Sequence, residues 1–336
     1  MKFYILEAFS LLLKTMPFIL IRLGTYALLG VGLTIYFAIA GGIAWLLGQL
    51  FGPLGFIIML AAAAGAWGIV QWATRYFFYL LKAAHTAVLT ELIVTGELPS
   101  GSQVEYGKQQ VTDRFRDTSI MFAVDRLVDG IVRGFNRKFA RIADLLPIPG
   151  MDSLVGVVQT IIGFATTFID ESILSRAYRY REENVWAVAQ DGVILYAQAW
   201  KPVLANAAAL ALVSYLEVLV VLVVLGLPAI GLGLLVPALK TPLGIMVLLA
   251  AWMFKLAFAD AHALAATLLA YHRSTEDLTP DAEWQERLSG LSDKFRELVK
   301  NAAEATGRVR GKLASTLDND PSVTPPDDTP STETLS

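Results

Sequence analysis

The chain has 336 residues, of which 55% are hydrophobic and only 17% are charged, and its mean hydropathy is +0.54. Soluble domains carry about 25% charged residues, so this composition excludes an ordinary soluble enzyme. The 27 basic and 30 acidic residues give a net charge of −3, which provides no overall basic excess for binding nucleic acid. The absence of cysteine excludes disulfides, thiolate metal sites and a cysteine nucleophile. The sequence predicts an all-α polytopic membrane protein.

Two long apolar stretches near the N-terminus predict a first transmembrane hairpin. A span of about 20 residues fits between Leu23 and Leu50, and a second span runs from Leu54 to Leu81. The short, uncharged link Gly52-Pro53 joins them, so the two helices are expected to be antiparallel neighbours. The small residues 61–66 would let another helix approach the second span closely.

A second hairpin is predicted near the other end of the chain. Residues 202–225 are nearly all Ala, Val and Leu, and residues 242–272 form another long apolar stretch. The connector 226–241 contains glycine and proline residues that are poor in a continuous helix.

The distribution of positive charge predicts the orientation of both hairpins. Lys and Arg are concentrated between the hairpins and after the last span, whereas the two hairpin tips hold only Lys240. Both termini and the middle region are therefore expected to be cytoplasmic, in a membrane such as the bacterial inner membrane. The predicted segments are an N-terminal region with the first hairpin (1–81), a cytoplasmic amphipathic and re-entrant region (82–201), the second hairpin (202–272), a cytoplasmic amphipathic helix (273–316) and a disordered tail (317–336).

One further apolar segment, 146–169, does not fit a four-span scheme. A single crossing there would place the basic residues that follow it outside the cell. We therefore predict a re-entrant or interfacial helix that begins at the turn Pro147–Gly150. A fifth span is the alternative.

Three segments have the periodicity of amphipathic helices. Residues 2–14 are predicted to lie in the membrane plane. Residues 111–143 carry apolar side chains at helical spacing, with basic residues opposite them, and the lipid-surface candidates are Arg126, Arg133, Arg137, Lys138 and Arg141. This basic face suits an anionic cytoplasmic leaflet, and the alternative is a helix packed on the protein's own spans.

The third amphipathic segment follows the last span. Its apolar side chains recur at intervals of three and four residues, namely Trp284, Leu288, Leu291, Phe295, Leu298 and Ala302. This short heptad pattern predicts either self-association into a homo-oligomer or docking onto helices of the same chain.

Chemical motifs give no support for an enzyme. The chain contains no HExxH, GxSxG or phosphate-loop pattern, so we expect no catalytic residues, no cofactor and no metal ion. Ionisable residues inside apolar spans are costly and are often functional. Glu217 and Lys255 fall at similar depths and could pair across the second hairpin, either as a polar site or gate or as a structural ion pair that locks the hairpin.

A polar track can be extended from this pair. His262 lies seven residues after Lys255, so both are expected on one side of the helix. Asp260, Gln71 and Arg75 fall at a similar depth. Together with Glu217, these residues are the candidates for a transport path.

Two short patches resemble the choline transporter-like family. One is Asn184–Gly192, followed by an Ala-rich span, and the other is Phe258–Asp277 with Thr267. The acidic residue that usually precedes this threonine is Ala266 here, and the family has more spans than this sequence predicts. The resemblance covers about a tenth of the chain and implies no specific functional residues.

The sequence therefore favours a path for a small solute or ion, formed by an oligomer because four spans are few for one protomer. The alternative is a non-catalytic scaffold that organises or remodels the membrane from its cytoplasmic leaflet. Membrane lipids, in particular anionic ones, are the expected partners in both cases.

Overall fold

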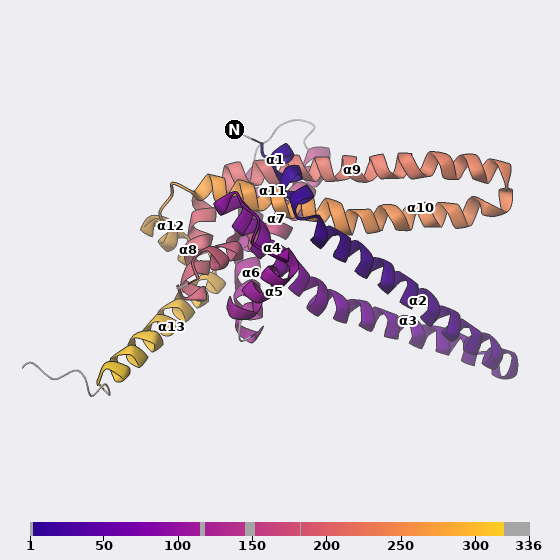
Figure 1. Ribbon diagram of the computed structural model, residues 1–336, viewed down its shortest axis with the longest axis horizontal. Coiled ribbons are helices and arrows are strands. Elements are labelled where there is room, and N and C mark those ends of the chain that lie inside the picture. Colours follow the sequence, from indigo (N-terminus) through magenta and orange to yellow (C-terminus); the bar gives the residue numbers. More distant parts are fainter. Residues whose placement is uncertain (1–2, 115–117, 145–151, 182, 319–336) are drawn as a thin grey trace, which may run out of the picture.

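The computed structural model describes residues 3–114, 118–144, 152–181 and 183–318, and every regular element in these ranges is a helix (Figure 1). Two pairs of long antiparallel helices project from a helical body, and we call these pairs the first and second arms. The first arm consists of α2 (Met16–Phe51) and α3 (Leu54–Ala73). The second consists of α9 (Trp200–Leu235) and α10 (Lys240–Phe254), joined through the short helix η2 (Pro237–Leu239).

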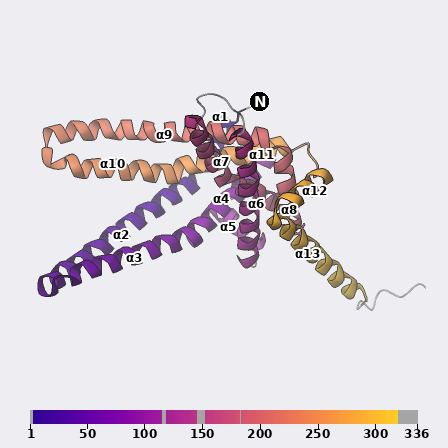
Figure 2. The same cartoon turned by 180° about the vertical axis from the view of Figure 1, so that it is seen from behind.

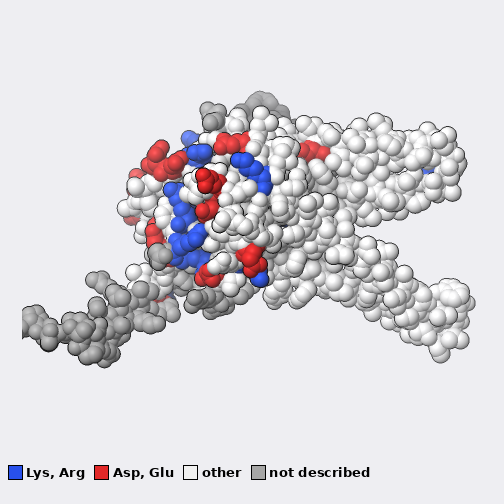
Figure 3. Space-filling model, in the orientation of Figure 1, with Lys and Arg blue, Asp and Glu red and all other residues white. Residues whose placement is uncertain are grey.

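The arms have the surface of membrane-embedded helices. Residues 23–73 contain no charged side chain, and the charged side chains gather on the body while the arms are almost free of them (Figure 3). Large apolar side chains are exposed along the arms, including Leu28 (76%), Trp45 (66%) and Leu235 (79%). A monomeric soluble protein rarely exposes such a continuous apolar surface.

Among the described residues, four helices are long and apolar enough to cross a membrane, and they cover Met16–Phe51, Leu54–Thr95, Trp200–Leu235 and Pro237–Thr275. The described chain is all-helical as predicted, and these four helices are compatible with a multi-pass membrane protein. Each of the two longest continuous helices, α2 and α9, has 36 residues. At 1.5 Å per residue such a helix is about 54 Å long and exceeds the hydrocarbon core, so its inner end extends into the body.

The body gathers the remaining helices around α7 (Asp152–Arg179). This helix packs against α4, α6, α8, α9 and α11, and Figure 2 shows the same arrangement from behind. The other helices of the body are α1 (Ile5–Lys14), α4 (Tyr79–Thr95), α5 (Gln103–Arg114), α6 (Thr118–Asp144), α8 (Val185–Gln198), α11 (Asp260–Thr275), α12 (Ala282–Leu291) and α13 (Asp293–Asp318).

The apolar faces of the amphipathic helices α6 and α13 are buried against other helices of the chain. The apolar face of α6 lies in the largest core cluster, where Val128 and Ile131 are 0% and 1% exposed. Phe295 and Leu298 of α13 are both fully buried in the same cluster. The structure therefore has α6 packed on the chain's own helices, and α13 docked onto the same chain.

The predicted re-entrant segment 146–169 is only partly described. Its opening turn, Pro147–Gly150, lies outside the described residues. The remainder belongs to α7 in the body, and α7 is not one of the four candidate spans found among the described residues.

The order of helices occurs twice along the chain. A short helix, a long helix, its antiparallel partner, a π-helical turn and three more helices run from α1 to α6 and again from α8 to α13. The junctions between the short and long helices have nearly the same backbone, with φ −103° and ψ 26° at Thr15 and φ −100° and ψ 16° at Ala199. The two halves therefore share this order of helices, apart from the extra short helix η2, and we call them repeats on that ground. Helix α7 lies between them in the chain, and both arms project from the same side of the body (Figure 1).

Candidate functional site

A cavity of about 710 Å³ lies at the base of the arms. The first arm contributes to it through α2, and so do the body helices α4, α6, α7 and α11 and the turns that follow α3 and α10. Its lining is mostly polar or aromatic and consists of Arg22, Tyr26, Thr74, Arg75, Tyr76, Phe78, Tyr79, Lys82, Phe122, Asp125, Arg126, Thr167, Phe168, Lys255, Leu256 and Asp260. This volume falls in the range of small-molecule sites.

A π-helical turn from each half of the chain borders this cavity. The turn η1 (Thr74–Phe78) follows α3, and the turn η3 (Lys255–Ala259) follows α10. Both supply residues to the lining, including Arg75 and Lys255. Single π-helical turns are rare and are frequently found at functional sites. Their equivalent positions in the two repeats mark the cavity as the candidate site.

The acidic residues at the cavity are accompanied by lysines. Lys255 Nζ lies 2.9 Å from one carboxylate oxygen of Asp260 and 3.1 Å from the other. Lys82 forms an ion pair with Glu171 of α7 and also contributes positive charge near Asp125. Neither Lys255 nor Lys82 is therefore an unpaired positive charge.

The three arginines of the cavity have no such partner. In the described part of the chain, no carboxylate lies within 4.0 Å of a side-chain nitrogen of Arg22, Arg75 or Arg126. Arg22 is only 6% exposed, and its Nη2 is buried without a hydrogen-bond partner. A buried guanidinium nitrogen left in this state is costly, because it has lost its water.

A cluster of acids lies beside the cavity, around Lys82. Asp170 of α7 is 8% exposed, and one of its carboxylate oxygens has no hydrogen-bond partner. Burial raises the pKa of Asp170 to about 8, although the charge of Lys82 opposes this shift. Burial also raises the pKa of Asp125. Asp170 therefore carries a proton for most of the time at neutral pH.

The predicted ion pair between Glu217 and Lys255 is wrong. Glu217 Oε1 instead lies 2.6 Å from His262 Nδ1, and His262 Nε2 lies 3.1 Å from the carbonyl oxygen of Ile5. His262 is 1% exposed and packs edge-on against Phe9. Glu217 and His262 thus form a separate buried site that ties α9 and α11 to α1, and neither residue lines the cavity.

The π-helical turn explains why the predicted polar track divides. Lys255 and His262 are seven residues apart, which in an α-helix would place them on one side. The turn η3 lies between them and holds one more residue than an α-helical turn, which rotates the following side chains by about 100°. As a result Lys255 and Asp260 face the cavity while His262 faces α1.

The other predicted path residues also divide. Arg75 lines the cavity together with Lys255 and Asp260. Gln71 is half-buried on α3 and is not among the lining residues.

The predicted lipid-surface residues lie in different surroundings on α6. Arg126 lines the cavity, and Arg133 Nε donates to Asp129 at 2.5 Å. Lys138 Nζ donates to the carbonyl oxygen of Leu291 at 3.3 Å, and Arg137 is exposed. The side chain of Arg141 lies outside the described residues. Their common face is therefore not a uniform basic surface.

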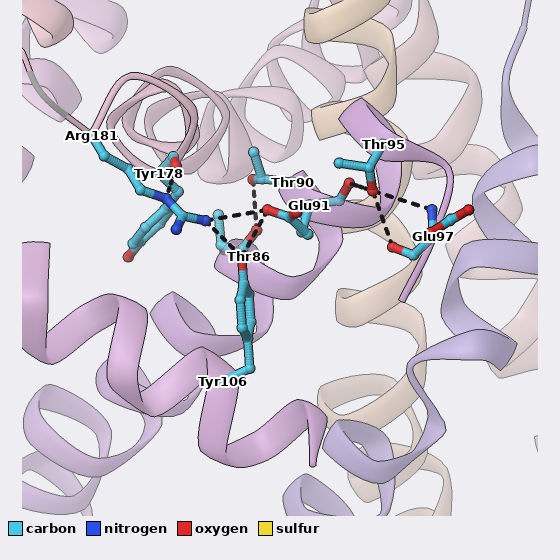
Figure 4. A network of polar contacts seen from close by, with 8 residues as sticks. All are labelled: Thr86, Thr90, Glu91, Thr95, Glu97, Tyr106, Tyr178 and Arg181. Atoms are coloured by element: carbon cyan, nitrogen blue, oxygen red, sulfur yellow. Dashed lines mark hydrogen bonds and ion pairs between the residues drawn. The ribbon is translucent and has the colours of Figure 1, made fainter. Parts of the chain in front are cut away.

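A polar network on the other side of α4 fastens it to α5 and to the end of α7 (Figure 4). Tyr106 donates its hydroxyl to Glu91 at 2.7 Å, and Arg181 donates to the Tyr106 oxygen at 2.7 Å. Arg181 also donates to the carbonyl oxygen of Tyr178 at 3.0 Å. Burial and the bond to Glu91 raise the pKa of Tyr106 to about 12, so it stays a hydrogen-bond donor. This network holds one wall of the body in place.

Comparisons of the chain with family models, with curated proteins and with solved structures found no match. The resemblance to the choline transporter-like family therefore stays a prediction.

Proposed function

We propose that this protein forms a transport path for a small charged solute or headgroup across a membrane. The observation that carries the proposal is the charged cavity between the two repeats, with a π-helical turn from each. In transporters built from repeats, substrate sites lie at the interface between the repeats. The cavity likewise takes residues from both halves of the chain.

The proposed path requires more than one copy of the chain. The arms diverge from the body, so that one chain does not enclose a continuous route to their tips (Figures 1 and 2). Their apolar surfaces remain exposed and available to lipid or to a second copy. We therefore keep the homo-oligomer predicted from the number of spans.

The proposed orientation follows from charge. The body carries most of the Lys and Arg side chains and both ends of the described chain, whereas Lys240 lies at the tip of the second arm (Figures 1 and 3). By the positive-inside rule the body lies in the cytoplasm, and a bacterial inner membrane suits the short arm tips.

A flux assay tests the proposal. The purified protein is placed in liposomes loaded with potassium phosphate or with glucose, and release is followed for wild type, Asp260→Asn and Glu217→Gln. Both carboxylates lie at the base of the second arm, but only Asp260 lines the cavity. We expect release that changes in Asp260→Asn and stays at the wild-type rate in Glu217→Gln. A transport function would be contradicted if the protein released neither phosphate nor glucose and did not move labelled lipid between the leaflets.

Membrane scaffolding is the second candidate, and one observation favours it. The outer side of α1 exposes Leu6 (85%), Phe9 (38%) and Leu13 (48%), so this helix can lie in the membrane surface. The longer helix α6 gives no such support, because Phe135 and its apolar neighbours are buried in the body. Replacing Leu6 and Leu13 by Glu should abolish any remodelling of liposomes if scaffolding is the function.

A further inference from the structure

We propose that the cavity binds the phosphate headgroup of an anionic phospholipid, with the acyl chains held between the two arms. This inference rests on the proposed function and names the ligand class of the same site. The argument uses the charge of the lining, the unpartnered guanidinium of Arg22, the depth of the cavity and the apolar surfaces beside it.

The charge of the lining selects an anion. Five basic and two acidic side chains line the cavity. Lys255 is engaged by Asp260, and Lys82 by Glu171 and the neighbouring acids. The remaining three basic groups are all arginines, whose planar guanidinium groups match phosphate oxygens in pairs. The lining therefore offers phosphate-binding groups that the protein itself leaves unoccupied.

Arg22 supplies the second observation that points to a ligand. It is 94% buried, lines the cavity and leaves Nη2 without an acceptor. A phosphate in the cavity would compensate the charge of this guanidinium, which no carboxylate of the described residues pairs with. Tyr26 also lines the cavity, and its hydroxyl can donate to a further phosphate oxygen. The hydroxyls of Thr74 and Thr167 already donate to the backbone carbonyls of Val70 and Gly163.

The depth of the cavity matches the level of a headgroup. Helix α3 has 20 residues between the arm tip and η1, which is about 30 Å at 1.5 Å per residue. This length equals the usual thickness of the hydrocarbon core. If the tip of the first arm lies at one boundary of that core, Thr74 and Arg75 lie at the other, where lipid phosphates are found.

The surroundings of the cavity favour a lipid over a soluble phosphate compound. From this level outward the arms present apolar side chains and separate from each other, and the space between them is visible in Figure 3. A soluble anion would gain nothing from these surfaces, whereas acyl chains would cover them. An amphiphile therefore fits both the cavity and the space beside it.

The test measures lipid binding by native mass spectrometry of the full chain in detergent. Phosphatidylglycerol is compared with phosphatidylcholine of the same acyl chains, and inorganic phosphate and glycerol 3-phosphate are added as competitors. Arg126→Gln and Arg137→Gln form a matched pair, because both arginines are exposed on α6 but only Arg126 lines the cavity. Arg75→Gln tests the lining from the first arm.

We expect phosphatidylglycerol to bind more tightly than phosphatidylcholine. Arg126→Gln and Arg75→Gln should each weaken that binding about fivefold, from about 1 kcal/mol per basic residue near a membrane surface, and Arg137→Gln should not. Equal binding of both lipids, or equal losses in Arg126→Gln and Arg137→Gln, would overturn the assignment. Displacement of the lipid by millimolar inorganic phosphate would overturn it in favour of a soluble anion.

A separate assay distinguishes failure of this inference from failure of the proposed function. Fluorescently labelled phosphatidylglycerol in liposomes is exposed to dithionite, which bleaches only the outer leaflet, with and without the protein. Selective binding with no change in bleaching and no release of phosphate or glucose would support the ligand and contradict transport. Phosphate release without selective lipid binding would support transport and contradict the lipid.

Discussion

The raised pKa of Asp170 predicts a stability that depends on pH, and Asp170→Asn isolates it. Asp170 is buried in α7, where Lys82 and Glu171 lie close by and Asp125 and Asp129 of α6 add negative charge. Its pKa is about 8 in the folded protein, compared with the ordinary value of 3.8. Between these two values the folded state binds more protons than the unfolded state. The free energy of unfolding must therefore fall as pH rises from about 4 to about 8.

The expected loss of unfolding free energy depends on the pH range over which unfolding is measured. Between pH 6 and the folded pKa there are about 2 pH units, and each unit corresponds to about 1.36 kcal/mol. Above pH 8 the penalty for Asp170 is complete. Relative to Asp170→Asn, wild type should therefore lose about 3 kcal/mol between pH 6 and pH 9. For a chain of this size the difference amounts to roughly 5 °C in apparent melting temperature.

The assay is thermal unfolding in detergent, followed by loss of helical circular dichroism at pH 6, 7, 8 and 9. Groups that do not interact with Asp170 affect both proteins alike, so the difference between the two curves reports Asp170 together with the charges coupled to it. Asp113→Asn is the control, because Asp113 is exposed on α5 and should follow wild type at every pH. Parallel curves for wild type and Asp170→Asn from pH 6 to pH 9 would refute the reasoning.

Three further predictions concern packing, and apparent melting temperature checks each. Phe295→Ala should cost about 3–5 kcal/mol because the ring is fully buried, whereas Leu291→Ala should be nearly neutral because that side chain is 43% exposed. Gly55→Ala would place a Cβ 2.6 Å from a carbonyl oxygen of α2 and should cost about 1–3 kcal/mol, while Gly41→Ala meets nothing within 4 Å. His262→Ala should cost about 1–3 kcal/mol by leaving the carboxylate that it binds unpaired, and a melting temperature equal to wild type would contradict that role.

The four candidate spans could be predicted from the sequence because hydropathy acts locally. A run such as 23–50 is apolar whatever its neighbours are, so its membrane character needs no knowledge of the fold. The apolar spacing of residues 284–302 was also readable from the sequence, although the structure divides this segment at Ser292 into α12 and α13. Its partner was not, because Phe295 could pack on a second copy or on the same chain with an identical sequence pattern.

The cavity could be predicted only in part. Lys255, Asp260 and Arg75 are conspicuous as charges near apolar spans, and all three line it. The pairing of Glu217 could not be found, because it depends on a rotation introduced by the π-helical turn η3. Arg22 is the one charged residue in the sequence between Pro17 and Phe51, but its unsatisfied Nη2 appears only in the folded structure.

Each arm is long, and its base lies at the cavity. An arm such as α3 extends about 30 Å beyond its π-helical turn, so a rotation of about 10° at the base would move its tip by about 5 Å. Both π-helical turns lie at this base and touch the same cavity. A ligand only a few Å across, bound against Arg75 and Lys255, would therefore lie where a small rotation of an arm gives the largest displacement of its tip.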